Sequence, residues 1–81
     1  MSKQIEIVAV ERPTAGPAFG VGAAWLVYAR ERDRSRTLPA EHLPEFVRSK
    51  MRNVYRAFFR ARWNDEDRKW TIIQTAPEQP W

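Results

Sequence analysis

The chain has 81 residues, with 14 Lys and Arg against 10 Asp and Glu, and it contains no cysteine. A chain of this length forms one domain and buries only about 60% of the surface that its unfolded form exposes. The lack of cysteine excludes disulfides, thiolate metal sites and a cysteine nucleophile, and it fits a reducing cytoplasm. The sequence therefore predicts a single domain over residues 1–81, with a thin core that aromatic residues fill.

Positive charge is concentrated in the middle of the chain. Residues 1–22 hold two basic against two acidic side chains, residues 23–62 hold ten against four, and residues 63–81 hold two against four. A basic region of this kind binds phosphates through counterion release and also attracts acidic protein surfaces. The alternative interpretation is that the arginines only solvate the surface of a small domain.

The sequence contains no recognisable membrane or export signal. No apolar run approaches the roughly 20 residues that a membrane span needs. Residues 1–6 also lack the layout of a signal peptide. We therefore predict a cytoplasmic protein that has no membrane partner.

The first predicted elements are a strand and a loop. Residues 4–10 mix alternation with β-branched residues, which is typical of a strand partly covered on both faces. Residues 12–22 hold two prolines and all three glycines, so they predict a loop. The segment Gly20-Val21-Gly22 is interpreted as a flexible connector, because a dinucleotide-binding loop needs three spaced glycines between a strand and a helix.

The second predicted strand covers residues 23–32 and leads into an alternating run of arginines. Its first half is apolar on both faces and its second half is charged on both, so we expect it to project beyond the core. Side chains of an extended chain alternate between two faces. One uninterrupted strand would therefore place four guanidinium groups in a row on one side, those of Arg30, Arg32, Arg34 and Arg36. A purely structural reason for the same charges is protection against edge-to-edge pairing.

One helix is predicted after this strand. Residues 37–41 suit a helix entry, because Thr caps helices and Pro is tolerated in the first turn. Pro44 disfavours helical dihedral angles at Leu43, so we expect the main helix to begin at Pro44 and residues 38–42 to form a separate short turn. Apolar residues then recur at helical spacing and predict an amphipathic helix that covers a sheet: Phe46, Val47, Met51 and Val54.

Residues 54–76 are predicted to form a β-hairpin. Residues 55–63 alternate in character, residues 64–69 are polar and suit a turn, and residues 70–75 are rich in strand formers. One face of the first strand would carry Tyr55, Ala57, Phe59, Ala61 and Trp63, and the other would carry Arg56, Arg60 and Arg62. Trp63 and Trp70 would then pair across the two strands.

A longer helix is the competing interpretation of these residues. It would extend to Ala61 and stack a ridge of arginines at i, i+4 spacing: Arg48, Arg52, Arg56 and Arg60. Asn53 is tolerated as a helix stop, and the adjacent Phe58 and Phe59 fit a strand with two faces. These residues favour the hairpin, and the helix remains an alternative.

The predicted fold class is α+β. The elements follow in the order β-β-α-β-β, which gives a small two-layer domain with an antiparallel sheet covered on one face by one helix. The second face of the sheet then stays open to the arginines of the hairpin. Residues 77–81 are predicted to form a tail, because Pro77 and Pro80 lack the N–H that a central strand needs. Trp81 is expected to tuck against the sheet, with exposure to a partner as the alternative.

The sequence offers no catalytic constellation. His42 is the only histidine, and no cysteine or paired carboxylate accompanies it to complete a triad, so we interpret it as a surface or packing residue. Asp65, Glu66 and Asp67 are adjacent carboxylates that lack the spaced oxygens and the glycine of a calcium loop. We therefore predict that the protein is not an enzyme and uses no metal and no cofactor.

Two binding functions remain, and both use the same predicted residues: Tyr28, Arg30, Arg32, Arg34, Arg36, Arg56, Arg60, Arg62 and Trp81. In the first, the arginines contact nucleic-acid phosphates while aromatic residues such as Tyr28 or Phe58 stack on bases. In the second, the arginines contact an acidic protein surface or the nucleic-acid channel of a larger complex. An aromatic residue such as Trp81 would then act as the anchor.

The layout of the whole chain resembles a group of small phage proteins. The first strand ends in Glu11-Arg-Pro13, a Gly/Pro loop and the strand Trp25–Tyr28 follow, and one helix and a hairpin from Phe58 to Thr75 complete the chain. In size and element order it resembles anti-CRISPR proteins that block type I surveillance complexes. The resemblance implies a stand-alone, non-enzymatic product of a mobile element. Such a product would occupy a surface of a host protein or nucleoprotein complex in the cytoplasm of the host cell.

Overall fold

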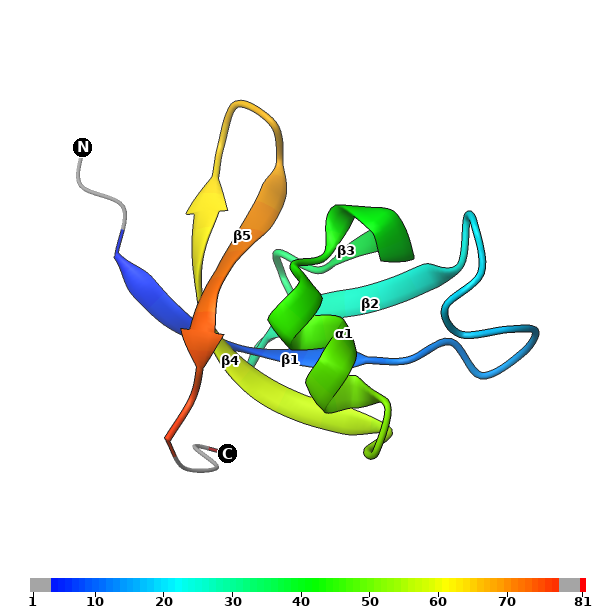
Figure 1. Cartoon of the computed structure of the whole chain (residues 1–81). Coiled ribbons are helices and arrows are strands. Elements are labelled where there is room, and N and C mark those ends of the chain that lie inside the picture. The colour runs from blue at the N-terminus through cyan, green and yellow to red at the C-terminus, as the bar shows by residue number, and fades with distance from the viewer. Residues whose placement is uncertain (1–3, 78–80) are drawn as a thin grey trace.

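The computed structural model describes residues 4–77 and residue 81 (Figure 1). Within them, five antiparallel strands form one sheet in the order β3-β2-β1-β4-β5. The strands are β1 (Ile5–Glu11), β2 (Ala24–Ala29), β3 (Arg36–Pro39), β4 (Arg56–Asn64) and β5 (Lys69–Thr75). The 3-10 helix η1 (Ala40–His42) and the helix α1 (Glu45–Met51) lie between β3 and β4 in the chain.

The predicted β-β-α-β-β order is wrong, because the chain forms a third strand before the helix. Residues 36–39 pair with β2 instead of entering a helix, and Leu38 lies opposite Trp25 in the register. Leu38 is buried in the core, and this burial outweighs the capping preference of Thr37. The additional strand widens the sheet, which curls into a half-barrel rather than forming a flat layer (Figure 1).

The predicted row of four arginines does not form. β2 ends at Ala29, whose carbonyl accepts a hydrogen bond from the backbone N–H of Arg32 at 3.0 Å. Arg32 has a φ of 64°, in the left-handed region, which takes the chain out of the extended conformation. Residues 30–35 therefore form the turn between β2 and β3, and their arginine side chains make different contacts.

β1 and the loop after it agree with the sequence prediction. β1 is the central strand, paired with β2 on one side and with β4 on the other. Val8, Ala9 and Val10 have no exposed surface, so both faces of the strand are covered at this point. The indole N–H of Trp25 donates a hydrogen bond to the carbonyl of Ala18 at 2.7 Å, which ties the loop to the core.

The hydrophobic core fills the concave face of the curled sheet. Alternate residues of the strands contribute to it, together with residues of η1 and α1. The main members are Val8, Val10, Trp25, Val27, Leu38, Leu43, Val47, Met51, Ala57, Phe59, Ala61, Trp63, Trp70 and Ile72. Because burial of one large apolar side chain contributes about 1.5–3 kcal/mol, this face supplies most of the stability of so small a domain.

α1 begins directly after Pro44, as predicted, but ends at Met51. Val47 and Met51 are fully buried against the concave face. Val54 and Tyr55 lie between α1 and β4 and are 37% and 49% exposed, so both lie outside the apolar faces predicted for them. α1 is therefore a helix of about two turns that covers part of the concave face.

The predicted hairpin over residues 54–76 is confirmed, and the long-helix alternative is wrong. β4 and β5 pair antiparallel, and buried and more exposed residues alternate along β4. Trp63 lies opposite Trp70, with ring centroids 5.1 Å apart. In the turn, Oδ1 of Asn64 accepts hydrogen bonds from the backbone N–H groups of residues 66 and 67, at 2.9 and 3.2 Å.

Candidate functional site

The convex face of the sheet, opposite α1, holds several of the predicted binding residues. The strand register places Tyr28 of β2 and Phe58 of β4 on either side of Ala9. Two residues further along β1, Glu11 lies opposite Arg56 of β4. We define the convex-face cluster by six residues that contact one another here: Glu11, Tyr28, Arg32, Arg56, Phe58 and Trp81.

Trp81 covers the aromatic part of this cluster. The centroid of its ring lies 5.1 Å from that of Phe58 and 5.8 Å from that of Tyr28, in tilted and edge-to-face geometries. Such pairs contribute about 0.5–1.5 kcal/mol beyond the burial of their area. The prediction that Trp81 packs against the sheet is therefore confirmed, while residues 78–80 of the predicted tail lie outside the described residues.

Two guanidinium groups lie against the same rings. Cζ of Arg56 is 5.1 Å from the ring centroid of Phe58, 5.8 Å from that of Tyr28 and 5.9 Å from that of Trp81. Cζ of Arg32, in the turn between β2 and β3, is 4.4 Å from the centroid of Tyr28. Cation–π contacts contribute about 0.5–1 kcal/mol at exposed sites. The rings therefore hold both arginines in defined positions.

Glu11 joins Tyr28 to Arg56. The hydroxyl of Tyr28 donates a hydrogen bond to Oε2 of Glu11 at 2.5 Å, and Nε of Arg56 lies 3.4 Å from the same oxygen. Burial raises the pKa of the Tyr28 hydroxyl above its ordinary value of 10.0, and the bond to Glu11 raises it further, whereas Arg56 and Arg32 lower it. The phenol therefore stays protonated and donates throughout the neutral pH range.

Arg60 and Arg62 continue the positive charge along β4. They lie opposite Ile7 and Ile5 of β1, on the same face as Phe58. Arg60 is half-buried and Arg62 is exposed. Neither forms an ion pair with the residues that the structure describes, and Nε of Arg60 is buried.

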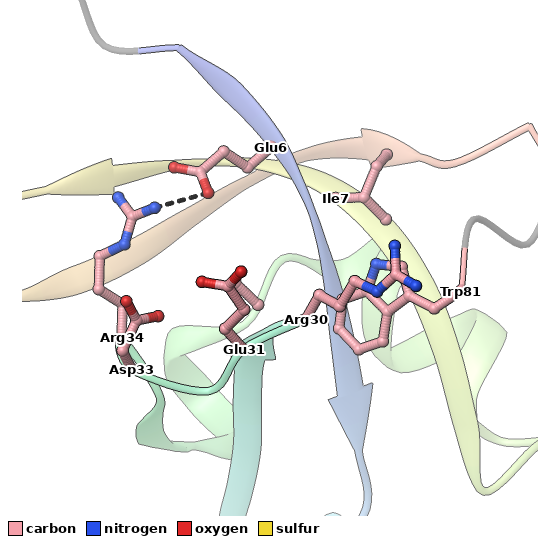
Figure 2. Close-up of a pocket in the computed structure, with 8 residues that line it drawn as sticks. Glu6, Ile7, Arg30, Glu31, Asp33, Arg34 and Trp81 are labelled. Atoms are coloured by element: carbon pink, nitrogen blue, oxygen red, sulfur yellow. Dashed lines mark hydrogen bonds and ion pairs between the residues drawn. The ribbon is translucent and has the colours of Figure 1, made fainter.

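A pocket of about 420 Å³ lies beside the cluster, between β1, the turn after β2 and Trp81 (Figure 2). Figure 2 shows Arg30 and Trp81 on one side of it and Glu6, Glu31 and Arg34 on the other. The lining also includes Ile7, Ala29 and Asp33. Arg30 is therefore near Trp81, but the pocket carries charges of both signs.

Arg34 and Arg36 were predicted in one row with Arg30 and Arg32, and both lie apart from the convex-face cluster. Nη2 of Arg34 is 2.6 Å from Oε1 of Glu6 (Figure 2), and its guanidinium lies 5.4 Å from the ring of Trp70. The indole N–H of Trp70 donates to the carbonyl of Arg34 at 2.7 Å, so Arg34 ties the turn to β5. Arg36 lies opposite Val27 and therefore on the concave side, at an exposed strand end.

Two carboxylates of β1 hold arginines in place, and neither was among the predicted binding residues. Glu11 pairs with Arg56, and Glu6 pairs with Arg34. Glu11 lies two residues after Ala9, and this spacing indicates that both side chains lie on the same face of β1. Its partners come from β2 and β4, so only the register of the folded sheet brings them together.

In residues 4–77 and 81, no three His, Asp or Glu side chains are arranged to hold a metal ion. None of the helices in that part of the chain is long and apolar enough to span a membrane. His42 is exposed at the end of η1.

No protein-family model matches the chain, and no curated protein or solved structure matches it significantly.

Proposed function

We propose that this protein is a small, non-enzymatic inhibitor of the anti-CRISPR kind, encoded by a mobile element and active in the cytoplasm of a host cell. Its convex face would occupy an anionic surface of a host nucleoprotein complex. One observation carries the proposal. Arginines from two separate parts of the chain, the turn after β2 and the strand β4, share one face with the partly exposed Trp81: Arg32, Arg56, Arg60 and Arg62.

Contacts within the convex-face cluster prepare its arginines for a partner. Arg56 is held by Glu11 and by three rings, so little side-chain freedom remains to be lost on binding. Arginine and aromatic residues are enriched at interfaces, where a few residues supply most of the binding energy. We place Arg56 and Trp81 at the centre of the contact, and Arg60 and Arg62 at its rim, where charges mainly speed encounter.

Direct binding of nucleic acid is the second candidate function. Arg60 and Arg62 favour it, because guanidinium groups along a strand can contact phosphates. Tyr28 is only 1% exposed and cannot stack on a base, and Phe58 is half-buried. Base stacking, on which many single-strand binders depend, would therefore fall mainly to Trp81.

The test uses a purified type I surveillance complex and its labelled target DNA. The wild-type protein is expected to bind the complex and to prevent its binding of the DNA in a mobility-shift assay. The double variant Arg60→Glu, Arg62→Glu should inhibit at least about tenfold less strongly, because two rim attractions become repulsions. The control is Lys50→Glu, Arg68→Glu, which makes the same change in net charge at exposed positions of α1 and the β4–β5 turn. It should inhibit like the wild type.

Binding to bare DNA and RNA separates the two functions. A nucleic-acid binder shifts the labelled strands without the complex and loses affinity steeply between about 50 and about 200 mM salt. If the protein binds bare DNA or RNA in this way and has no affinity for the complex, the inhibitor function is overturned and direct nucleic-acid binding takes its place. No binding to the complex or to either nucleic acid would overturn both.

A further inference from the structure

The curled sheet has an open seam between its two edge strands. In the order β3-β2-β1-β4-β5, the strands β3 and β5 each pair on one side only (Figure 1). The indole N–H of Trp70 on β5 donates to the carbonyl of Arg34, just before β3, so the two edges approach each other there. Leu38 of β3 and Ile72 of β5 line one pocket between them. We name this groove the β3–β5 seam.

β5 presents free backbone groups along the seam. Within the described residues, no backbone hydrogen bond outside the strand ladder reaches residues 69–74. In an antiparallel edge strand, alternate residues direct their N–H and C=O groups away from the neighbouring strand. An extended chain that lies in the plane of the sheet can satisfy these groups.

An apolar pocket opens beside this edge. It has a volume of about 140 Å³ and is lined from β5 by Trp70 and Ile72, and from the opposite side by Leu38, Leu43 and Pro44. A cavity of about 150 Å³ holds a benzene-sized group, so this pocket accepts one apolar side chain. A free strand edge beside a side-chain pocket is the arrangement of β-strand addition, in which the main chain supplies affinity and the pocket supplies specificity.

We propose that the β3–β5 seam binds a short, extended, acidic segment of a partner protein, which adds as a strand to residues 69–72 of β5. The register is regular over these residues, and a bulge follows before Gln74, which limits the added strand to about four residues. One valine- or leucine-sized side chain of the segment enters the pocket. Lys69, which carries an ammonium group, also belongs to the lining of the pocket, so an acidic residue next to the apolar one complements the seam.

β3 does not serve as the acceptor strand. It has four residues and ends in Pro39, which has no N–H to donate. The N–H of Ala40 already donates to the carbonyl of Ala23 at 2.9 Å. The seam shares no residue with the convex-face cluster, so this proposal does not depend on the proposed inhibitor function.

Two synthetic peptides with the same side chains test the proposal. The probe is fluorescein-labelled Gly-Ser-Asp-Val-Thr-Val-Asp-Ser-Gly, and the control carries N-methyl groups on the three central amides and cannot pair as a strand. We expect saturable binding of the probe in fluorescence anisotropy and at least about tenfold weaker binding of the control. Amide NMR shifts should appear in residues 69–72 and 38–44, with slower hydrogen exchange at the β5 edge.

Charge-reversal variants test the acidic character of the segment, and other results would assign the seam to a different occupant. Lys69→Glu should weaken binding of the probe about threefold to tenfold, whereas Lys50→Glu, the same reversal on the exposed side of α1, should leave it unchanged. The proposal is overturned by absence of probe binding, by equal binding of the N-methylated control, or by shifts confined to the convex face. A concentration-dependent dimer that perturbs residues 69–72 without peptide would assign the seam to a second copy of the chain, and would also overturn it.

Discussion

The two faces of the sheet bury aromatic rings with different partners. On the concave face, the indole N–H groups of Trp25 and Trp70 donate to backbone carbonyls, and the rings pack in an apolar core. On the convex face, Tyr28 is buried to the same degree, but its hydroxyl donates to Glu11 and arginines lie against its ring. Apolar packing and hydrogen bonds to backbone carbonyls stabilise the first face, where the Arg34–Glu6 ion pair lies beside the ring of Trp70. Contacts of Arg32, Arg56 and Glu11 with the aromatic side chains stabilise the second.

If the convex face binds a partner as proposed, this difference separates stability from binding within a single sheet. Apolar burial on the concave face is non-directional and depends on close packing, so that face tolerates little change. The charged contacts of the convex face are partly solvated, and each contributes less to folding. A small domain can therefore present arginines on one face because the other face holds the fold together. The two faces can be compared by mutating matched residues.

The largest expected effect comes from two adjacent phenylalanines on opposite faces of β4. Phe59 is fully buried on the concave face, and Phe59→Ala should lower the free energy of unfolding by about 3–5 kcal/mol. Phe58 is half-buried on the convex face, and Phe58→Ala should cost only about 1–2 kcal/mol. Urea unfolding followed by circular dichroism measures both. Equal losses would contradict the division into a face that stabilises the fold and a face proposed to bind a partner.

A smaller effect is expected at the tryptophan pair of the hairpin. Trp70→Phe should lower the free energy of unfolding by about 1–3 kcal/mol, because it leaves the carbonyl of Arg34 without its indole donor. Trp63→Phe removes the same ring atoms, but the indole nitrogen of Trp63 makes no hydrogen bond to the described residues. Thermal unfolding should show a larger loss for Trp70→Phe than for Trp63→Phe. The reverse order would mean that the turn is not tied to β5 through this bond.

Tyr28→Phe tests the charged contacts of the convex face. We expect a loss of about 1–2 kcal/mol at neutral pH, since the hydroxyl donates to a carboxylate. Folding raises the pKa of Tyr28 above 10.0, so the unfolded chain releases this proton first as the pH rises through that value, and the free energy of unfolding falls. Urea midpoints measured from about pH 8 to about pH 11 should therefore decline less steeply in Tyr28→Phe than in the wild type.

The control for this pH profile is Tyr55→Phe, which removes a phenol that is 49% exposed. Identical alkaline slopes for Tyr28→Phe and the wild type would contradict the role assigned to burial and to Glu11 in the folded protein.

The smallest effect on folding is expected at the rim arginines of β4. Arg62→Glu should change the free energy of unfolding by no more than about 0.5 kcal/mol, because Arg62 is exposed and forms no ion pair with the described residues. Arg60→Glu should change it by about 1 kcal/mol, because Arg60 is half-buried and its Nε is buried. Chemical denaturation of each variant measures this. A loss above about 2 kcal/mol would place these arginines among the residues that stabilise the fold.

Local pattern predicts several elements of this protein correctly. The alternation over residues 55–63 and the polar turn after it predict the hairpin, because a strand with one buried face repeats every two residues. Pro44 predicts the start of α1, since it restricts the residue before it. These signals act between residues close together in the chain.

The arginine-rich turn shows where the same reasoning fails. Alternation of Arg with acidic residues over residues 30–36 is compatible with a strand, but Arg32 adopts a left-handed conformation and the chain reverses. Leu38 then pairs opposite Trp25 and is buried. Pairing of residues 36–39 with the edge of β2 stabilises the fold only when the rest of the sheet is present. The local sequence pattern carries no information about that sheet, so the strand β3 was not predicted.

Sequence patterns predicted a small, strand-rich domain with a basic middle segment, and they favoured a C-terminal hairpin over a longer helix and packing of Trp81 on the sheet over its exposure. Hydrophobic periodicity and proline positions reflect preferences of a few neighbouring residues, so they can be recognised in the sequence. Three features became visible only in the folded sheet: Arg32 and Arg56 lie against Tyr28, Arg34 turns back to Glu6, and β3 and β5 leave a seam. Those contacts depend on sheet register and curl, which arise only when strands distant in sequence pack together.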